Sequence, residues 1–196
     1  MSEPKKKAAK LYQVIKALTA MRLTKEDSVP NGILSRDGDG FTLTKNDNEK
    51  QACLFQGSIG AAFNQAQLEQ AGITHILTAA GAIQPRFEAT IKYKIIPLMD
   101  SPTCNIAKFF EEANEWIHEV LTENINNKVL VHCFAGKSRA STITLAYLMA
   151  KQRVVLKDAV IHLKARRPIA EPNVGFTIQL KAFEKAVFGE CSDVPF

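Results

Sequence analysis

Apolar residues between positions 51 and 190 recur with two spacings that alternate along the chain. Short runs of aliphatic and β-branched residues predict four buried strands, at 52–58, 73–80, 93–100 and 128–133. Apolar positions three or four residues apart predict helices, at 61–72, 105–124, 140–152, 156–166 and 174–188. Strands that alternate with helices predict an α/β domain, in which the strands form parallel pairs covered by helices.

The first 50 residues have a different character. Residues 5–22 predict an amphipathic helix, with an apolar stripe through Leu11, Ile15 and Leu18 and lysines on its other sides. Residues 27–50 are rich in turn-forming residues and contain a candidate short strand in the segment GFTLT. We therefore divide the chain into an N-terminal extension, 1–50, and a main domain, 51–190. The main domain is expected to hold a mixed, mostly parallel sheet of about five strands flanked by helices.

Composition restricts the setting of the protein. Hydrophobic residues make up 46% of the chain and charged residues 23%, which is typical of a globular protein. No apolar run reaches the roughly 18 residues of a membrane span. The four cysteines have no paired spacing, and this argues against both a disulfide framework and a zinc site. This pattern favours a reducing compartment, the cytoplasm or also the nucleus.

The positive charge of the chain is concentrated near its N-terminus. Residues 1–25 contain seven Lys or Arg and one Glu, whereas the remainder contains 18 basic and 19 acidic residues. The near-neutral remainder lacks a basic stripe, so we expect no nucleic-acid partner. The basic helix at 5–22 has three interpretations: a calmodulin target, a docking segment for a kinase, or a helix that packs its apolar stripe on the main domain.

The stretch VHCFAGKSRAST, at 131–142, combines residue types that suit phosphate chemistry. A predicted strand leads through a glycine-containing loop into a helix that begins near Arg139. Backbone N–H groups in such a turn, together with the positive potential of the helix N-terminus, form a cup for a tetrahedral dianion. We expect the same potential to favour the thiolate of Cys133 at the floor of the cup. Arg139 can donate two parallel hydrogen bonds to phosphate oxygens.

This stretch matches the Cys-x5-Arg signature of the cysteine-dependent phosphatases, and the surrounding segments resemble their dual-specificity branch. The resemblance extends over roughly residues 50–188, through GSIGAAFNQAQLEQAGITHILTAA, YKIIPLMD, the helix from Asn105 and ARRPIAEPNVGFTIQL. The chain looks most like small atypical members without a separate kinase-docking domain, especially a plant-type member with a basic N-terminal helix. The resemblance implies an α/β domain of cysteine-phosphatase type that hydrolyses phosphotyrosine and phosphoserine or phosphothreonine, without a metal or cofactor.

The resemblance also implies a role for each site residue. Cys133 attacks phosphorus and forms a phosphocysteine, while Asp100 protonates the leaving oxygen and then activates water. Arg139 holds the phosphate, and His132 and Asn173 support the loop. The residues whose backbone N–H groups bind phosphate are Phe134, Ala135, Gly136, Lys137, Ser138 and Arg139.

Ala140 departs from the family pattern, which has Ser or Thr directly after the arginine. That hydroxyl bonds to the cysteine sulfur as the thiolate leaves, so its absence implies normal loading and slower release of phosphate. Losing a hydrogen bond to a charged group costs about 1.5–3 kcal/mol, which is roughly 10- to 150-fold in rate. At the level of sequence it stays open whether Ser138 or Ser141 compensates.

Three functions are compatible with these residues. A phosphoprotein substrate, with a MAP-type kinase as one candidate, agrees best with the resemblance. Lys137 leaves open a non-protein substrate (a phosphoinositide, an RNA 5′ end or a glycan), although Phe134 stands where lipid phosphatases carry a basic residue. Slow release at Ala140 leaves open a module that binds phosphoproteins with little turnover.

Overall fold

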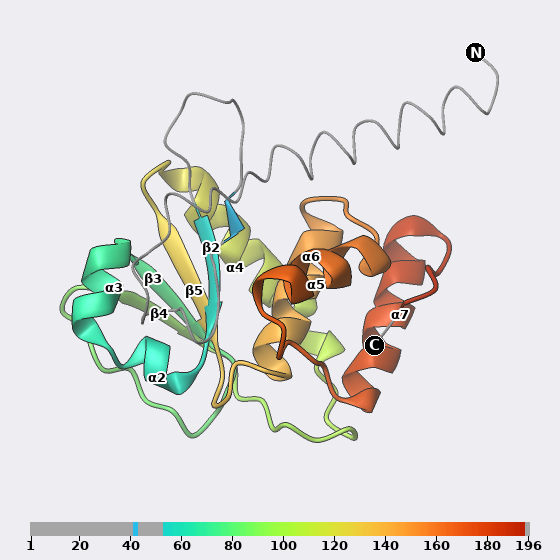
Figure 1. The fold of residues 1–196 in the computed structure, drawn as a ribbon, viewed down its shortest axis with the longest axis horizontal. Coiled ribbons are helices and arrows are strands. Elements are labelled where there is room, and N and C mark those ends of the chain that lie inside the picture. Colours follow the sequence, from blue (N-terminus) through green and yellow to red (C-terminus); the bar gives the residue numbers. More distant parts are fainter. Residues whose placement is uncertain (1–40, 43–52, 195–196) are drawn as a thin grey trace, which may run out of the picture.

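A sheet of five strands forms the centre of the domain (Figure 1). The computed structural model describes residues 41–42 and 53–194, and its strands lie in the order β1-β2-β5-β3-β4. Four strands are mutually parallel, namely β2 (Cys53–Gly57), β5 (Lys128–His132), β3 (His75–Thr78) and β4 (Lys92–Ile95). The edge strand β1 (Phe41–Thr42) is antiparallel to β2. The prediction of a mixed, mostly parallel sheet of about five strands is confirmed.

Helices cover both faces of this sheet (Figure 1). On one face, α2 (Ile59–Ala62) and α3 (Gln65–Ala71) pack against a cluster that includes Phe55, Ile76 and Leu130. The larger core lies on the other face, beneath η1 (Ala107–Phe109), α4 (Phe110–Glu123), α5 (Arg139–Ala150), α6 (Leu156–Arg166) and α7 (Val174–Phe188). Because the central strands β3 and β5 are covered on both sides, their residues are buried without alternation, from His75 to Thr78 in β3 and from Val129 to His132 in β5.

Two predicted elements end differently in the structure. The helix predicted at 61–72 is two helices, because Asn64 caps α3 by accepting a hydrogen bond from Gln67 N at 3.2 Å. The strand predicted at 93–100 stops at Ile95. Ile96 N still donates to Thr78 O at 2.9 Å, but Leu98 N, the next donor facing β3, turns back and bonds to Ile96 O at 2.9 Å. The chain from Pro97 onwards is therefore free to leave the sheet and run towards the loop after β5.

The N-terminal extension is described only in β1, which lies inside the predicted strand GFTLT. The amphipathic helix predicted at 5–22 lies outside the described residues. Within the described part, no helix has both the length and the apolar character needed to cross a membrane.

The start of α7 packs against the loop that follows β4. Asn173 caps α7, since its Oδ1 accepts the hydrogen bond from Phe176 N at 3.0 Å. A Cβ built on Gly175 would overlap the carbonyl oxygen of Pro102. Glycine is required there because the two backbones approach so closely, and this approach brings Asn173 beside Asp100.

We predict that Gly175→Ala lowers the free energy of unfolding by about 1–3 kcal/mol, because either the helix or the loop must move. Urea denaturation would measure the change. Gly60→Ala is a matched control, since a Cβ there would meet only Ser58 Oγ at an ordinary 3.5 Å. Equal stabilities for the two variants would contradict the close approach.

Candidate active site

The stretch 131–142 forms a strand–loop–helix unit at the carboxyl ends of the parallel strands, as predicted. Cys133 follows β5 directly and is 1% exposed, and α5 begins at Arg139. Gly136 has a φ of +64°, and a Cβ on it would overlap the carbonyl oxygen of Gly57. The loop can therefore turn tightly against the end of β2 only with glycine at this position.

The carbonyl groups of the loop are all bonded to the surrounding protein. Each carbonyl oxygen from Cys133 to Lys137 accepts a hydrogen bond, and the donors in order are His132 Nδ1, Ile59 N, Arg167 Nη2, Arg167 Nε with Gln56 Nε2, and Glu171 N. The backbone N–H groups of residues 134–139 have no acceptor among the described residues. Six donors in one short turn are thus left to bind an anion above Cys133.

Arg167 is the main brace of this loop. It is 2% exposed, and it donates from Nε to Gly136 O at 2.6 Å and from Nη2 to Ala135 O at 2.9 Å. Gln56 adds a bond from Nε2 to Gly136 O at 3.1 Å. No sequence pattern predicts a role for either residue. Arg167 lies in a segment that matches the family, but nothing in the sequence distinguishes it from its neighbour Arg166.

The structure brings four predicted site residues together at the rim of the cup. Asp100 Oδ1 accepts hydrogen bonds from Ser138 Oγ at 2.7 Å and from Asn173 Nδ2 at 2.9 Å. Asp100 Oδ2 lies 3.4 Å from Arg139 Nε, and Arg139 Nη1 donates to Leu98 O at 3.2 Å. The carboxylate of Asp100 and the guanidinium of Arg139, which are 39 positions apart in the chain, therefore meet beside the N–H donors.

His132 supports the loop from beneath. Its Nδ1 lies 3.3 Å from Cys133 O and its Nε2 lies 2.9 Å from Thr78 Oγ1. A carbonyl oxygen only accepts, so Nδ1 carries the proton and Nε2 accepts from the threonine hydroxyl. Burial lowers the pKa of His132 to about 4, although the bond to Cys133 O acts in the opposite direction. The ring is neutral at neutral pH and ties β3 to the end of β5.

No neighbouring serine replaces the hydroxyl that Ala140 lacks. Ala140 is fully buried. Ser141 Oγ donates its proton to Lys137 O at 2.5 Å and accepts from Gln56 Nε2 at 2.9 Å. Ser138 Oγ donates to Asp100. A hydroxyl has one proton, so neither serine has a donor left for the sulfur of Cys133.

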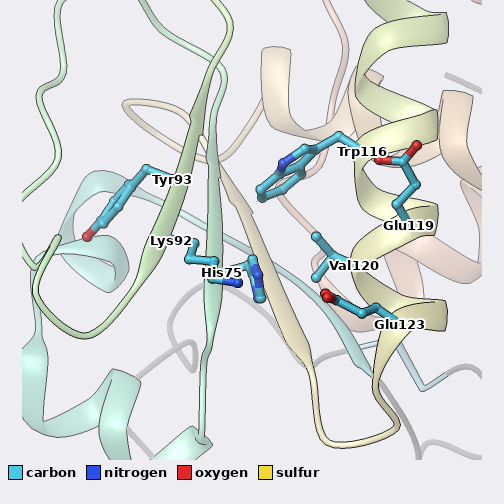
Figure 2. A pocket seen from close by; sticks show the side chains of 7 residues that line it. All are labelled: His75, Lys92, Tyr93, Trp116, Glu119, Val120 and Glu123. Carbon is cyan, nitrogen blue, oxygen red and sulfur yellow. The ribbon is translucent and has the colours of Figure 1, made fainter.

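A separate pocket of about 480 Å³ lies between α4 and the first residues of β3 and β4 (Figure 2). It is lined by His75, Lys92, Tyr93, Trp116, Glu119, Val120 and Glu123. His75 and Lys92 are the first residues of β3 and β4, whereas Cys133 follows the last residue of β5. No predicted site residue lines this pocket, so it is not the predicted phosphate-binding site. The described residues also contain no group of His, Cys, Asp or Glu that could hold a metal ion.

Comparisons with known proteins agree with this geometry. Residues 54–186 match the family described as dual specificity phosphatase, catalytic domain. The chain is 40% identical over 134 residues to dual specificity protein phosphatase 1 of Arabidopsis thaliana, which covers 68% of this chain and 67% of that protein. It is 39% identical over 142 residues to MAP kinase phosphatase with leucine-rich repeats protein 3 of Dictyostelium discoideum, which covers 72% of this chain but 16% of that protein. The crystal structure of DUSP15 is 37% identical, with a TM-score of 0.65, and the match covers 71% of this chain and 87% of that one.

We predict that Arg167→Met weakens the binding of tungstate, a tetrahedral dianion, by about 10- to 100-fold, because the freed carbonyls can turn towards the cup. Isothermal titration calorimetry would measure the dissociation constant. Arg86→Met is the matched control, since Arg86 only lies over the ring of Phe63, 5.0 Å from its centroid. Unchanged affinity in a folded Arg167→Met protein would show that the loop does not need this brace.

Stability is predicted to fall as the pH drops from 6.5 to 4. His132 stays neutral in the folded state but gains a proton in the unfolded state near the ordinary pKa of 6.5, so unfolding binds a proton in this window. The contribution reaches about 3 kcal/mol at pH 4. Denaturation of His132→Gln across this range should give a shallower slope of unfolding free energy against pH.

His162 is a second buried histidine with which to compare His132. Burial, together with the charge of Arg166, lowers the pKa of His162 to about 4. The double variant with His162→Gln should be shallower still. If unfolding free energy varies with pH as steeply in His132→Gln as in the parent protein, the assignment of a neutral, buried His132 ring is contradicted.

Proposed function

Because this chain belongs to the dual specificity phosphatase family, it is a cysteine-dependent protein phosphatase, and we propose that Cys133, Arg139 and Asp100 carry its chemistry. The observation that supports these roles best is the loop itself, in which the six residues after Cys133 have backbone N–H groups with no acceptor in the described part of the chain. We assign the catalytic domain to residues 51–190 and treat 1–50 as an extension.

In the first step, the Cys133 thiolate attacks phosphorus as the bond to the leaving oxygen breaks, which gives a phosphocysteine. The N–H groups of residues 134–139 and the fork of Arg139 hold the three equatorial oxygens and stabilise their charge in the transition state. Asp100 protonates the leaving oxygen. Its Oδ1 is held by Ser138 and Asn173, which leaves Oδ2 to carry the proton.

In the second step, Asp100, now ionised, takes a proton from the water that attacks the phosphocysteine. The sulfur of Cys133 leaves as a thiolate. Since Ala140 offers no hydroxyl, and since Ser138 and Ser141 donate their protons elsewhere, this thiolate is stabilised only by the backbone of the loop. We therefore expect loading to be fast relative to release.

The proposed substrates are proteins that carry phosphotyrosine, phosphoserine or phosphothreonine. A MAP-type kinase is one candidate, supported by the name of the Dictyostelium relative. A phosphoinositide is disfavoured because the Lys137 ammonium is paired with Glu171 at 2.6 Å and because Phe134, next to Cys133, is apolar and 64% exposed. A cytoplasmic or nuclear location and calmodulin binding through residues 5–22 stay predictions.

Because Ser138 and Ser141 donate their protons elsewhere, a second candidate function is favoured. If hydrolysis as a whole is slow enough, a phosphoprotein stays bound in the cup for longer than it is turned over, and the protein then acts as a module that binds phosphoproteins. This function uses the same cup. It requires slow loading as well as slow release, because loading already frees the dephosphorylated protein.

Rapid-quench kinetics with a ³²P-labelled phosphotyrosine peptide would test both functions. We predict a burst of dephosphorylated peptide with ³²P on the parent protein, followed by release about 10- to 150-fold slower than in Ala140→Ser. Cys133→Ser should give neither burst nor label. Asp100→Asn should slow the burst itself, most strongly with a peptide whose leaving oxygen belongs to serine.

The outcomes separate the alternatives. Tight binding of the phosphopeptide by the parent protein, without a burst and without covalent label, would favour the binding module. A parent protein as inactive as Cys133→Ser, on this peptide and on a panel of other phosphate esters, would contradict the phosphatase mechanism. Equal release rates in the parent and Ala140→Ser would show that the missing hydroxyl has no cost.

A further inference from the structure

Lys137 and Glu171 are joined twice at the rim of the cup. The Lys137 ammonium lies 2.6 Å from Glu171 Oε2, and Glu171 N donates to Lys137 O at 2.9 Å. The backbone bond fixes the glutamate beside the loop, so the ion pair does not depend on two freely moving side chains. Both side chains are about half exposed, at 50% and 56%, so they face whatever approaches the cup.

The other cations of the loop and its brace are also engaged by the protein. Arg139 bonds to Leu98 O and lies beside Asp100, and Arg167 is buried against the loop carbonyls. The exposed side chains next to the cup include two apolar ones, Phe134 and Met99, at 64% and 74% exposure. The rim therefore offers a substrate apolar contacts and a neutralised lysine.

We propose that Glu171 is a specificity-determining residue that makes the cup selective for a singly phosphorylated site over one with a second phosphate two residues away. Glu171 acts in two ways: it occupies the ammonium of Lys137, and its own charge repels the second phosphate. The inference rests on the proposed function, since it concerns the choice among phosphoprotein substrates of the same site.

The distances make this effect measurable. Residues two positions apart in an extended peptide are separated by roughly 7 Å, so a second phosphate lies within about 7 Å of a phosphate held by the loop that carries Lys137. The Debye length at physiological ionic strength is about 8 Å, so a charge at this distance is only partly screened. Removing one negative charge and freeing one positive charge should therefore change the relative rate for a doubly phosphorylated peptide by about three- to tenfold at low salt.

The test compares two peptides of one sequence, one with phosphotyrosine alone and one with phosphothreonine two residues before it. Dephosphorylation of the tyrosine is followed by its fluorescence, which gives kcat/KM for each peptide. The measured quantity is kcat/KM for the doubly phosphorylated peptide divided by kcat/KM for the singly phosphorylated one. Glu171→Gln keeps the shape and the backbone bond, and it should raise this ratio about three- to tenfold. The gain should shrink as salt is added.

Two variants control this comparison. Glu119→Gln makes the same change in net charge in the separate pocket that Glu119 lines, and it should leave the ratio at the parental value. Lys137→Met added to Glu171→Gln should remove most of the gain, because no ammonium is then freed.

An unchanged ratio in Glu171→Gln, or a gain that fully survives Lys137→Met, would overturn the inference while the phosphatase function stands. A gain of the same size in Glu119→Gln would also overturn it, since net charge alone would then explain the result. A parent protein that dephosphorylates neither peptide, even in a single turnover, would instead overturn the proposed function, and the inference with it.

Discussion

The structure depends on the direction of the peptide groups between Cys133 and Arg139. A short loop can present its N–H groups to one side only if its carbonyl groups find acceptable partners on the other. Here those partners come from several separate elements, among them Gln56 on β2 and Arg167 at the end of α6. Carbonyl groups left without donors would cost about 1–3 kcal/mol each and would favour turning towards the ligand. The anion cup is thus a property of the whole domain.

The rim of the cup is tied to the same framework. Ser138, inside the loop, donates to Asp100, and Asn173 caps α7 with its Oδ1 while its Nδ2 donates to the same carboxylate. One amide side chain therefore fixes both a helix N-terminus and the carboxyl group assigned as the general acid. Gly175 permits this by allowing α7 to approach the loop after β4. The proposed acid is positioned by packing between distant segments rather than by its own loop.

The hydrogen bonds and the ion pair that support the loop also limit its chemistry. The hydroxyls of Ser138 and Ser141 orient the acid and close the loop, so they are unavailable to the sulfur of Cys133. The ammonium of Lys137 is likewise held by Glu171. A loop whose carbonyl groups and polar side chains are largely used for support is rigid, but it leaves the departing thiolate and any second phosphate without side-chain donors. Rigidity, slow release and a narrow choice of substrate would then share one physical origin.

The sequence by itself determined the alternation of strands and helices, because the apolar spacing of buried elements is a local property. It also pointed to Cys133, Arg139 and Asp100 as candidate site residues, since a strand, a glycine loop and a helix follow one another without a gap at 131–142 and the aspartate directly follows an apolar run. It placed the end of one strand five residues too late, because the turn of Leu98 N back to Ile96 O has no mark in the apolar pattern. Only the tertiary structure decided which arginine of the pair 166–167 is buried, where the two serine hydroxyls donate, and that Lys137 is paired. Those outcomes depend on atoms brought together from positions far apart in the chain, and no local pattern records them.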